Sequence, residues 1–418
     1  MDHVIGLKCV LCGEEYGLDE VLYVCPKHGY EGILDVIYDS ELIKGRLTKE
    51  GLARNPDLSI WRYKPLLPVA SDSLTPPLQI GWTPLYHARG LGDRLGLPNL
   101  YLKDDGRNPT ASLKDRASAL GVAKALELRK EVITCASTGN AASSLAGVAA
   151  SVGLKSVIFA PENAPPAKVA QMLIFGAQVI LVKATYDEAF DLCLAASQEF
   201  GWYSRNTAYN PYLSEGKKTA ALEIGEQLGW RAPDKVFVSV GDGCIIGGLH
   251  KGFKDLLALG FLEEMPQIFG VQAEGAAPLA RAWERGRPVE PVVPRTIADS
   301  ISVGVPRDAV KALRAARESG GRFLVVSDEE ILAAMRELGR EAAIFAEPAG
   351  AAGYAGFKRA LEQGLIEPEE WVVVLVTGNG LKDVDSAIMA TKEPPKIEPT
   401  MKALRQLREE TNPFDISP

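Results

Sequence analysis

The stretch Lys235-Val-Phe-Val-Ser-Val-Gly-Asp-Gly-Cys-Ile-Ile-Gly-Gly248 decides the fold of this chain. Its first six residues are rich in valine and phenylalanine, which is typical of a strand buried on both faces of a parallel sheet. Glycines then end the strand, and a helical segment follows. Unpaired N–H groups in such a loop, with the positive end of the helix dipole, can hold a phosphate group. The stretch therefore predicts a strand–loop–helix unit with an anion site at 241–245, and ordinary turns are the alternative interpretation.

Two common nucleotide-binding motifs are missing from this loop. No G-K-[ST] follows the glycines, so it is not a phosphate loop of the Walker type. The third glycine is also misplaced for G-x-G-x-x-G, which disfavours a nicotinamide cofactor.

The alternation of apolar strands and helices extends outward from this stretch in both directions. Strands are expected at 132–136, 156–160, 179–182, 235–240, 268–272, 323–326 and 371–376. Helices are expected at 141–151, 167–175, 186–200 and 244–259. This order predicts an α/β protein with doubly wound, mostly parallel sheets.

Length and composition describe an ordinary globular protein. The chain has 418 residues, of which 46% are hydrophobic and 24% charged, and this length favours two domains. A net charge of −8 argues against sequence-independent binding to nucleic acid or to an anionic membrane. The apolar runs are shorter than the ~20 residues of a spanning helix, and the first residues lack a signal-peptide core. We therefore expect a soluble cytoplasmic protein with neither nucleic acid nor membrane as a partner.

Half of the six cysteines lie in the first 25 residues. Cys9, Cys12, Cys25 and His28 have the spacing C-x2-C-x12-C-x2-H, which suits two knuckles around one tetrahedral zinc ion. Without a nearby acid or an open position, such a zinc would be structural. The alternative is a surface loop with unrelated thiols. The three remaining cysteines lie in apolar contexts and are expected to be packing residues: Cys135, Cys193 and Cys244.

Polar residues follow three of the expected strands, at the edge of the sheet where ligands bind. They are Ser137-Thr-Gly-Asn140, Gly241-Asp-Gly-Cys244 and Thr377-Gly-Asn-Gly380. Lys114 lies among small polar residues in Asn108-Pro-Thr-Ala-Ser-Leu-Lys-Asp-Arg116, ahead of a helix. Such an amine can form a Schiff base with a carbonyl cofactor, whereas a solvated charged face is the commoner fate of a Lys-Asp-Arg run.

Taken in order, five segments resemble the fold type II family of pyridoxal-phosphate enzymes, which includes tryptophan synthase β. These segments are 112–116, 137–140, 241–244, Glu347-Pro-Ala-Gly350 and Thr377-Gly-Asn-Gly-Leu-Lys-Asp383. Gly81-Trp-Thr-Pro-Leu85 is similar to the family's G-x-T-P-L opening. The resemblance covers roughly residues 78–400 and is greatest to the threonine synthase family, some members of which also carry an N-terminal cysteine cluster.

The resemblance implies roles for individual residues. Lys114 would bind pyridoxal 5'-phosphate covalently and move the α-proton of the substrate. Asn140 would bond to the phenolic oxygen of the ring, and Thr377 would face the pyridine nitrogen. The cofactor phosphate would be held by Gly241, Asp242, Gly243, Cys244 and Ile245. The substrate carboxylate would be received by Ser137, Thr138 and Gly139.

For this family the implied reaction converts O-phospho-L-homoserine and water into L-threonine and phosphate. A second anion site for the leaving phosphate is expected around Asn206, Thr207, Lys217 and Lys218. The segment from Asn206 to Thr219 resembles the family pattern N-P-x-R-x-E-G-x-K, but Leu213 stands where the arginine belongs. A guanidinium is the usual partner of a phosphate dianion.

Because Leu213 stands in place of the family's arginine, other reactions stay open. One alternative is β-replacement or ammonia elimination on phosphoserine, serine or threonine, as in relatives resembling cysteate synthase or a dehydratase. A non-catalytic ligand-binding relative is a further alternative, against which the presence of Lys114 argues.

The resemblance also suggests how the chain is divided. We expect a zinc-ribbon-like segment at 1–40, a large cofactor-binding domain at 41–110 and 205–390, and a small α/β domain at 111–204. The cofactor would lie between these two domains. Residues 391–418 would form a C-terminal strap, and the protein would act as a homodimer on a small amino-acid substrate.

Overall fold

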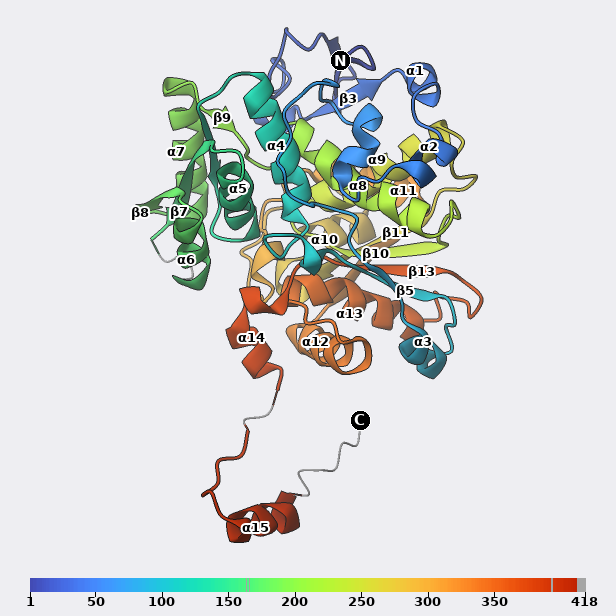
Figure 1. Cartoon of the computed structure of the whole chain (residues 1–418), viewed down its shortest axis with the longest axis vertical. Coiled ribbons are helices and arrows are strands. Elements are labelled where there is room, and N and C mark those ends of the chain that lie inside the picture. Colours follow the sequence, from blue (N-terminus) through green and yellow to red (C-terminus); the bar gives the residue numbers. More distant parts are fainter. Residues whose placement is uncertain (163, 165, 392–393, 412–418) are drawn as a thin grey trace.

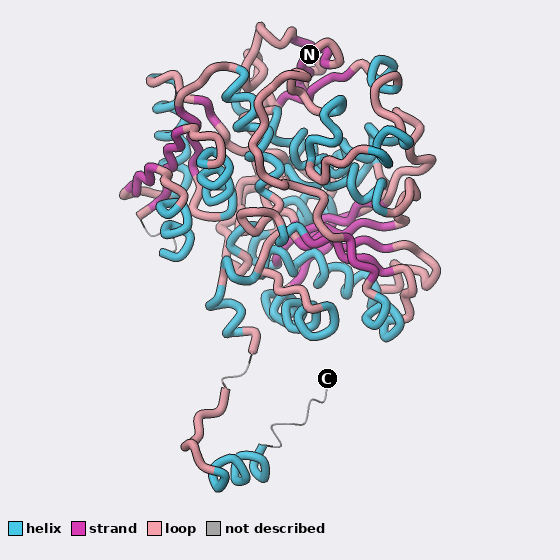
Figure 2. Tube along the Cα trace, viewed as in Figure 1, coloured by secondary structure: helices cyan, strands magenta, loops and turns pink. Residues whose placement is uncertain are grey.

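Two parallel β-sheets, each covered by helices on both faces, form the body of the protein in this computed structural model (Figure 1). The structure describes residues 1–162, 164, 166–391 and 394–411. Figure 2 shows the strands of the two sheets in separate parts of the molecule. The expected α/β class, with a small N-terminal cysteine-bearing sheet before it, is confirmed.

The larger sheet has six strands in the order β12-β11-β10-β13-β5-β4, and all neighbours are parallel except the pair β4 and β5. Its strands are β4 (Leu85–His87), β5 (Leu100–Asp104), β10 (Lys235–Ser239), β11 (Gln267–Ala273), β12 (Arg322–Val326) and β13 (Val372–Val376). The expected strands at 235–240, 268–272, 323–326 and 371–376 are confirmed within one or two residues.

Both faces of this sheet are buried, which explains why its strands are mostly apolar. Along β10, Val236 and Val238 enter one core and Phe237 enters the other. The first core is shared with α8 (Tyr212–Gln227), α9 (Cys244–Ala258), α10 (Pro278–Arg285) and α11 (Ala309–Glu318). The second is shared with α3 (Arg89–Leu95), α12 (Asp328–Ala342) and α13 (Pro348–Glu362).

The smaller sheet has four parallel strands in the order β8-β7-β6-β9. They are β6 (Val132–Ala136), β7 (Lys155–Pro161), β8 (Gln178–Val182) and β9 (Tyr203–Ser204). One face packs on α4 (Lys114–Glu127), α5 (Asn140–Ala150) and α6 (Pro166–Ile174), and the other on α7 (Tyr186–Glu199). Residues 132–204 therefore carry a sheet of their own, while the exact domain boundaries stay a prediction.

A buried ion cluster fastens the start of α4 to the larger domain. Arg116 donates to Asp105 (Nε to Oδ2, 2.7 Å) and to Glu223 (Nη2 to Oε2, 2.8 Å). Lys103 donates to the same Glu223 carboxylate at 2.6 Å. These four side chains are fully buried, and removing one partner from such a cluster leaves an uncompensated charge. The cluster therefore holds Lys114, two residues earlier, in a fixed place.

The N-terminal segment forms a three-stranded antiparallel sheet in the order β2-β1-β3. Its strands are β1 (Val4–Cys9), β2 (Glu15–Tyr16) and β3 (Leu34–Tyr38), and the short helices α1 (Ser40–Lys44) and α2 (Lys49–Arg54) follow. Lys251 of α9 donates to the Val36 carbonyl (2.7 Å) and Lys311 of α11 to the Leu34 carbonyl (3.1 Å). The small sheet is thus bonded directly to two helices of the larger domain.

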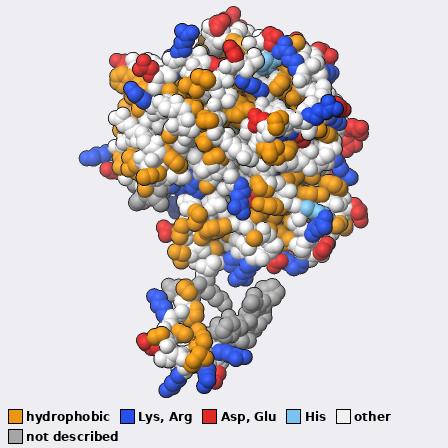
Figure 3. All heavy atoms as spheres, viewed as in Figure 1, with side chains coloured by type: hydrophobic (Ala, Val, Ile, Leu, Met, Phe, Trp, Pro, Cys, Tyr) orange, Lys and Arg blue, Asp and Glu red, His pale blue; other side chains and the backbone are white. Residues whose placement is uncertain are grey.

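The last described helix, α15 (Met401–Thr411), lies apart from the body beyond α14 (Val384–Met389) (Figure 1). Figure 3 shows apolar, basic and acidic side chains together on this helix, and basic and acidic groups interspersed on the body. Among the described residues, no helix has both the length and the apolar character needed to cross a bilayer.

Candidate active site

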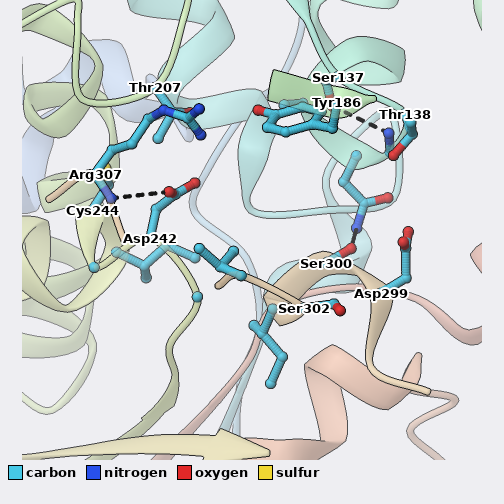
Figure 4. Close-up of a pocket in the computed structure, with 18 of the residues that line it drawn as sticks. Ser137, Thr138, Tyr186, Thr207, Asp242, Cys244, Asp299, Ser300, Ser302 and Arg307 are labelled. Carbon is cyan, nitrogen blue, oxygen red and sulfur yellow. Dashed lines mark hydrogen bonds between the residues drawn. The ribbon is translucent and has the colours of Figure 1, made fainter. Parts of the chain in front are cut away.

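A cavity of about 400 Å³ lies between the two parallel sheets, at the carboxyl ends of their strands. Its wall consists of the loops after β6 and β10, the residues after β9, the start of α4, one side chain of α8 and parts of the irregular segment 292–307. Figure 4 shows Thr207, Asp242 and Arg307 on one side of the cavity, opposite Thr138 and Asp299.

Lys114 is the first residue of α4, and the backbone before it is bonded to the end of β13. The Leu113 amide donates to the Thr377 carbonyl at 2.9 Å. Burial, and then the neighbouring cations of Lys217 and Arg205, lower the pKa of Lys114 to about 8. A neutral amine is the nucleophilic form, so Lys114 is able to attack a carbonyl group near neutral pH.

The lowered pKa of Lys114 predicts its reactivity in the cofactor-free protein. Trace acetylation by isotopic acetic anhydride, measured on the Lys114 peptide by mass spectrometry, should rise with pH and reach half its maximum near pH 8. Lys217→Met removes the larger of the two cationic contributions, so the midpoint should move to higher pH. A wild-type midpoint near 10.5, or one that Lys217→Met leaves in place, contradicts this assignment.

The loop after β10 has the geometry of an anion site. Gly243 is the N-cap of α9 with φ +98°, and a Cβ there would lie 2.6 Å from the Asp308 carbonyl oxygen, so the position requires glycine. The first N–H groups of α9 have no partner within the helix and face the loop. The carboxylate of Asp242 accepts a hydrogen bond from the Arg307 backbone (3.3 Å), which accounts for an acid in this loop.

The loop after β6 leads into the N-terminus of α5 across the cavity. The Gly139 amide donates to Ser137 Oγ (3.2 Å), which fixes the turn. Asn140 donates from Nδ2 to Glu347 Oε1 (2.6 Å) and to Ser300 Oγ (3.3 Å), while its buried Oδ1 has no partner among the described residues. A buried polar atom without a partner is costly, so Asn140 is poised to bond to a ligand.

The cavity brings together most of the residues that the sequence singled out. It is lined by Lys114, Ser137, Thr138, Gly139, Asn140, Asn206, Thr207, Lys217, Gly241, Asp242, Gly243, Cys244 and Ile245. Lys217 is almost completely buried, so it is not a solvated lysine at a helix start.

Two of the predicted residues do not line the cavity. Thr377 lies just behind it, with Oγ1 3.3 Å from the hydroxyl of Ser239, which does line it. Lys218 is turned into a separate cluster, where its ammonium contacts Glu215 (2.7 Å) and Asp255 (2.6 Å). Lys218 is therefore not placed as a substrate ligand, because its charge is already neutralised by Glu215 and Asp255.

Asn206 faces the cavity but its amide is occupied within the protein. Its Oδ1 accepts from the Ala136 amide (2.8 Å), and its Nδ2 donates to Ser204 Oγ (3.2 Å) and Cys193 Sγ (3.4 Å). Asn206 thus ties the ends of β6 and β9 together and positions the cavity wall.

Sequence reasoning missed part of the wall. The additional residues are Tyr186, Arg205, Asp299, Ser300 and Arg307. Three of them belong to 292–307, which has no periodic pattern to mark it. Arg205 follows β9, a strand of two residues that is too short to recognise from sequence.

The segment 299–307 bridges the two halves of the protein over the cavity. Asp299 forms an ion pair with Lys168, and Arg307 donates to Asp187 at 2.7 Å. Ser300 accepts from Asn140, as described above. This segment therefore helps to close the cavity off from bulk water.

The N-terminal cysteine cluster is well formed. The ligand atoms of Cys9, Cys12, Cys25 and His28 all lie within 4.8 Å of one another. A tetrahedral zinc ion with Zn–S bonds of about 2.3 Å requires sulfurs about 3.8 Å apart, which fits this set. A Cβ on Gly32 would lie 2.6 Å from the Cys25 Cβ, so the turn beneath the cluster needs glycine.

Comparisons with known proteins agree with this geometry. The family described as "Pyridoxal-phosphate dependent enzyme" matches residues 77–378. A protein named "Threonine synthase" from Methanocaldococcus jannaschii is 43% identical over 406 residues, covering 96% of this chain and 99% of its own length. Another of that name from Mycobacterium tuberculosis H37Rv is 38% identical over 338 residues, covering 81% and 91%.

Solved structures resemble the fold as well. The processed form of threonine deaminase isoform 2 from Solanum lycopersicum has a TM-score of 0.66 at 24% identity, covering 89% of this chain and 96% of that one. Diaminopropionate ammonia lyase from Escherichia coli has a TM-score of 0.65 at 20% identity, covering 80% and 93%.

Proposed function

We infer the reaction from one premise: the chain belongs to the family of pyridoxal-phosphate-dependent enzymes, in the group that contains the threonine synthases. We propose that it converts O-phospho-L-homoserine and water into L-threonine and phosphate. The near-complete, 43% identical match to a threonine synthase supports this reaction. The observation that carries the proposal is a nucleophilic lysine, Lys114, facing a cavity that also contains a phosphate-type loop.

The cavity fits pyridoxal phosphate on its own features. Lys114 offers an amine of lowered pKa, the N-terminus of α9 offers an anion cradle that requires Gly243, and Asn140 has an unpartnered buried oxygen. When bound, the cofactor supplies an electron sink for the α-carbon of the substrate. Thr377, which lies just behind the cavity wall, would offer a hydroxyl instead of a carboxylate for the pyridine nitrogen, which favours elimination and replacement over transamination.

The chain's own residues then bind, orient and protonate the substrate. The Thr138 amide, the hydroxyls of Ser137 and Thr138 and the N-terminus of α5 receive its carboxylate, because the Ser137 and Gly139 amides already donate to the Phe159 carbonyl and to Ser137 Oγ. Lys114 removes the α-proton and later returns a proton, because a lysine of lowered pKa exchanges protons readily near neutral pH. In the net reaction a β-proton is also removed and the Cγ–O bond to phosphate breaks. Cγ takes up a proton to become the methyl group of threonine, the oxygen of water joins Cβ, and the remaining proton of water is released.

Exclusion of bulk water matters because water is also a reactant that must attack only Cβ. The contacts of Asp299 with Lys168 and of Arg307 with Asp187 join the two halves of the protein across the cavity. We propose that these contacts keep the cavity closed during the reaction.

Three further properties remain part of the proposal. The cluster of Cys9, Cys12, Cys25 and His28 holds a structural zinc ion, for which the mutual distances of its ligand atoms give support. The protein acts in the cytoplasm, and it acts as a homodimer.

A substrate panel tests the reaction. Purified holoenzyme should release phosphate and threonine in equal amounts from O-phospho-L-homoserine. It should form 2-oxobutyrate from threonine, and pyruvate from serine or phosphoserine, at rates at least about 100-fold lower. Serine and threonine lack the phosphate, and phosphoserine is one carbon shorter, so its phosphate does not reach the same place while its carboxylate is held. Activity on the unphosphorylated amino acids alone would replace this proposal with an ammonia-lyase. Phosphate release from phosphoserine alone would indicate β-replacement.

A further inference from the structure

Arg205 differs from the other buried arginines of the described chain in having no acidic partner. Arg62 pairs with Glu226 at 2.6 Å, and Arg116 pairs with Asp105 and Glu223. Arg205 is just as buried, at 1% exposure, yet its guanidinium donates only from Nε to Ser118 Oγ at 3.2 Å. Its buried Nη2 has no hydrogen-bond partner within the described residues.

A buried guanidinium without a counter-ion is costly, and natural proteins rarely keep one without use. Burial also lowers the pKa of Arg205, which agrees with a cation that lacks a neutralising partner. The side chain lines the same cavity as Lys114 and Lys217. Its charge therefore faces the place where an anionic ligand would complete its hydrogen bonds.

Arg205 also lies next to Leu213, where the chain departs from the family pattern N-P-x-R-x-E-G-x-K. A Cβ built on Gly121 of α4 would lie 3.2 Å from Leu213 Cδ2 and 3.5 Å from Arg205 Cγ. The two side chains therefore flank the same point of α4. Leu213 occupies the place of the arginine in N-P-x-R-x-E-G-x-K. The guanidinium of Arg205 is therefore present near this place, although the motif itself lacks one.

We propose that Arg205, which follows β9, binds the phosphate group of the substrate, with Lys217 as a second cation. Arg205 thus replaces the arginine that the family pattern has where this chain has Leu213. This inference rests on the proposed function, because it assigns the leaving phosphate of that reaction. A planar guanidinium can bind a phosphate through two parallel hydrogen bonds, and two donor groups of Arg205 remain available for this. The phosphate of the cofactor has its own cradle at 241–245.

The test measures phosphate binding without relying on turnover. Inorganic phosphate is titrated into the holoenzyme by calorimetry, and L-2-aminobutyrate serves as a second probe with the same carboxylate but no phosphate. Arg205→Met should weaken phosphate binding roughly 10- to 100-fold, the usual effect of losing charged hydrogen bonds. Binding of L-2-aminobutyrate should change by less than about threefold, since its carboxylate is held elsewhere.

Two further variants distinguish phosphate binding by Arg205 from misfolding and from a merely structural role of this residue. Arg205→Lys keeps a buried cation but loses the fork, so phosphate binding should remain weakened. Arg205→Met combined with Leu213→Arg restores a guanidinium beside the same point of α4 and should recover part of the phosphate affinity. Only a direct role in phosphate binding predicts this recovery.

Other outcomes overturn the inference. Phosphate affinity that is unchanged in an Arg205→Met variant with full cofactor content would show that Arg205 does not bind it. A loss of cofactor affinity, with phosphate binding to the loaded enzyme intact, would assign Arg205 to the cofactor phosphate. If wild-type holoenzyme binds phosphate through Arg205 but does not convert O-phospho-L-homoserine, the proposed reaction fails while the phosphate subsite stands.

Discussion

Replacing Lys114 by alanine is expected to lower threonine formation roughly 10³-fold or more, because one side chain provides both the attacking amine and the proton transfer at the α-carbon. The reason lies in its surroundings. Lys114 begins α4 inside the cavity, and burial together with the cations of Lys217 and Arg205 lowers its pKa to about 8. Alanine preserves the helix, since alanine is a strong helix former.

The visible spectrum measures this effect independently of turnover. Wild-type enzyme should absorb at about 410–420 nm when loaded with pyridoxal phosphate, and Lys114→Ala should lose that band because no amine is left to bind the cofactor. A variant that kept the band would show that another lysine carries the cofactor.

Lys382 supplies a matched control. Burial lowers its pKa to about 8 as well, but its amine donates to Ser143 Oγ (2.9 Å) and Gln171 Oε1 (2.7 Å) and does not line the cavity. Lys382→Met should therefore keep the absorption band. A lowered pKa makes a lysine reactive only where its amine is free to meet a ligand.

Most of the parallel strands were predictable from sequence because burial on both faces makes them largely apolar. In β10, Val236 and Phe237 enter opposite cores, so no polar residue breaks the run. The short strands β4 and β9 were not predicted, since three and two residues are too few to establish a period. β5 was not predicted either, and its apolar run is interrupted by the buried charges of Lys103 and Asp104. Fold class could thus be inferred from the longer apolar strands, including the edge strands β8 and β12, whereas the short edge strands β4 and β9 and the inner strand β5 could not be recognised.

The candidate site was predictable where residues follow a strand in an ordered motif. The loops after β6 and β10 and the start of α4 meet at one cavity, as their positions in the sequence suggested. Charged side chains were less predictable, because a sequence does not reveal which charges are neutralised. Lys217 and Lys218 are adjacent and equally buried, yet one faces the cavity and the other pairs with Glu215 and Asp255. Only the direction of each side chain on α8 decides this.

The N-terminal segment is connected to the cavity wall by direct contacts. Tyr23 accepts a hydrogen bond from the Ser204 amide (2.9 Å) and stacks on Tyr209 with ring centroids 4.6 Å apart. Ser204 immediately precedes Arg205 and Asn206, which line the cavity. The segment from 1 to 38 contributes few residues to an apolar cluster that it shares with Leu67, Leu120 and Tyr212 of the body, so we expect the cysteine cluster to contribute to its order. The metal should therefore influence the cavity from a distance.

Replacing Cys9 by serine is accordingly expected to remove the bound metal and loosen the cavity wall. Metal analysis should find about one zinc per chain in the wild type and almost none in the variant, because a tetrahedral site of this kind uses all four ligands. Structural zinc contributes about 10 kcal/mol or more to the folding of small metal-bound segments, so residues around Tyr23 should lose protection in hydrogen exchange. KM for O-phospho-L-homoserine should rise, by up to about 100-fold if the wall moves by about 1 Å.

Cys135→Ser is the control, because this buried cysteine lies in the core of the smaller sheet and is not part of the metal-ligand cluster. It should keep the zinc and leave hydrogen exchange around Tyr23 unchanged. Absence of metal from the wild type would refute the zinc assignment. Loss of metal from Cys9→Ser without any change in exchange or KM would instead show that the contacts of Tyr23 with Ser204 and Tyr209 hold the wall in place by themselves.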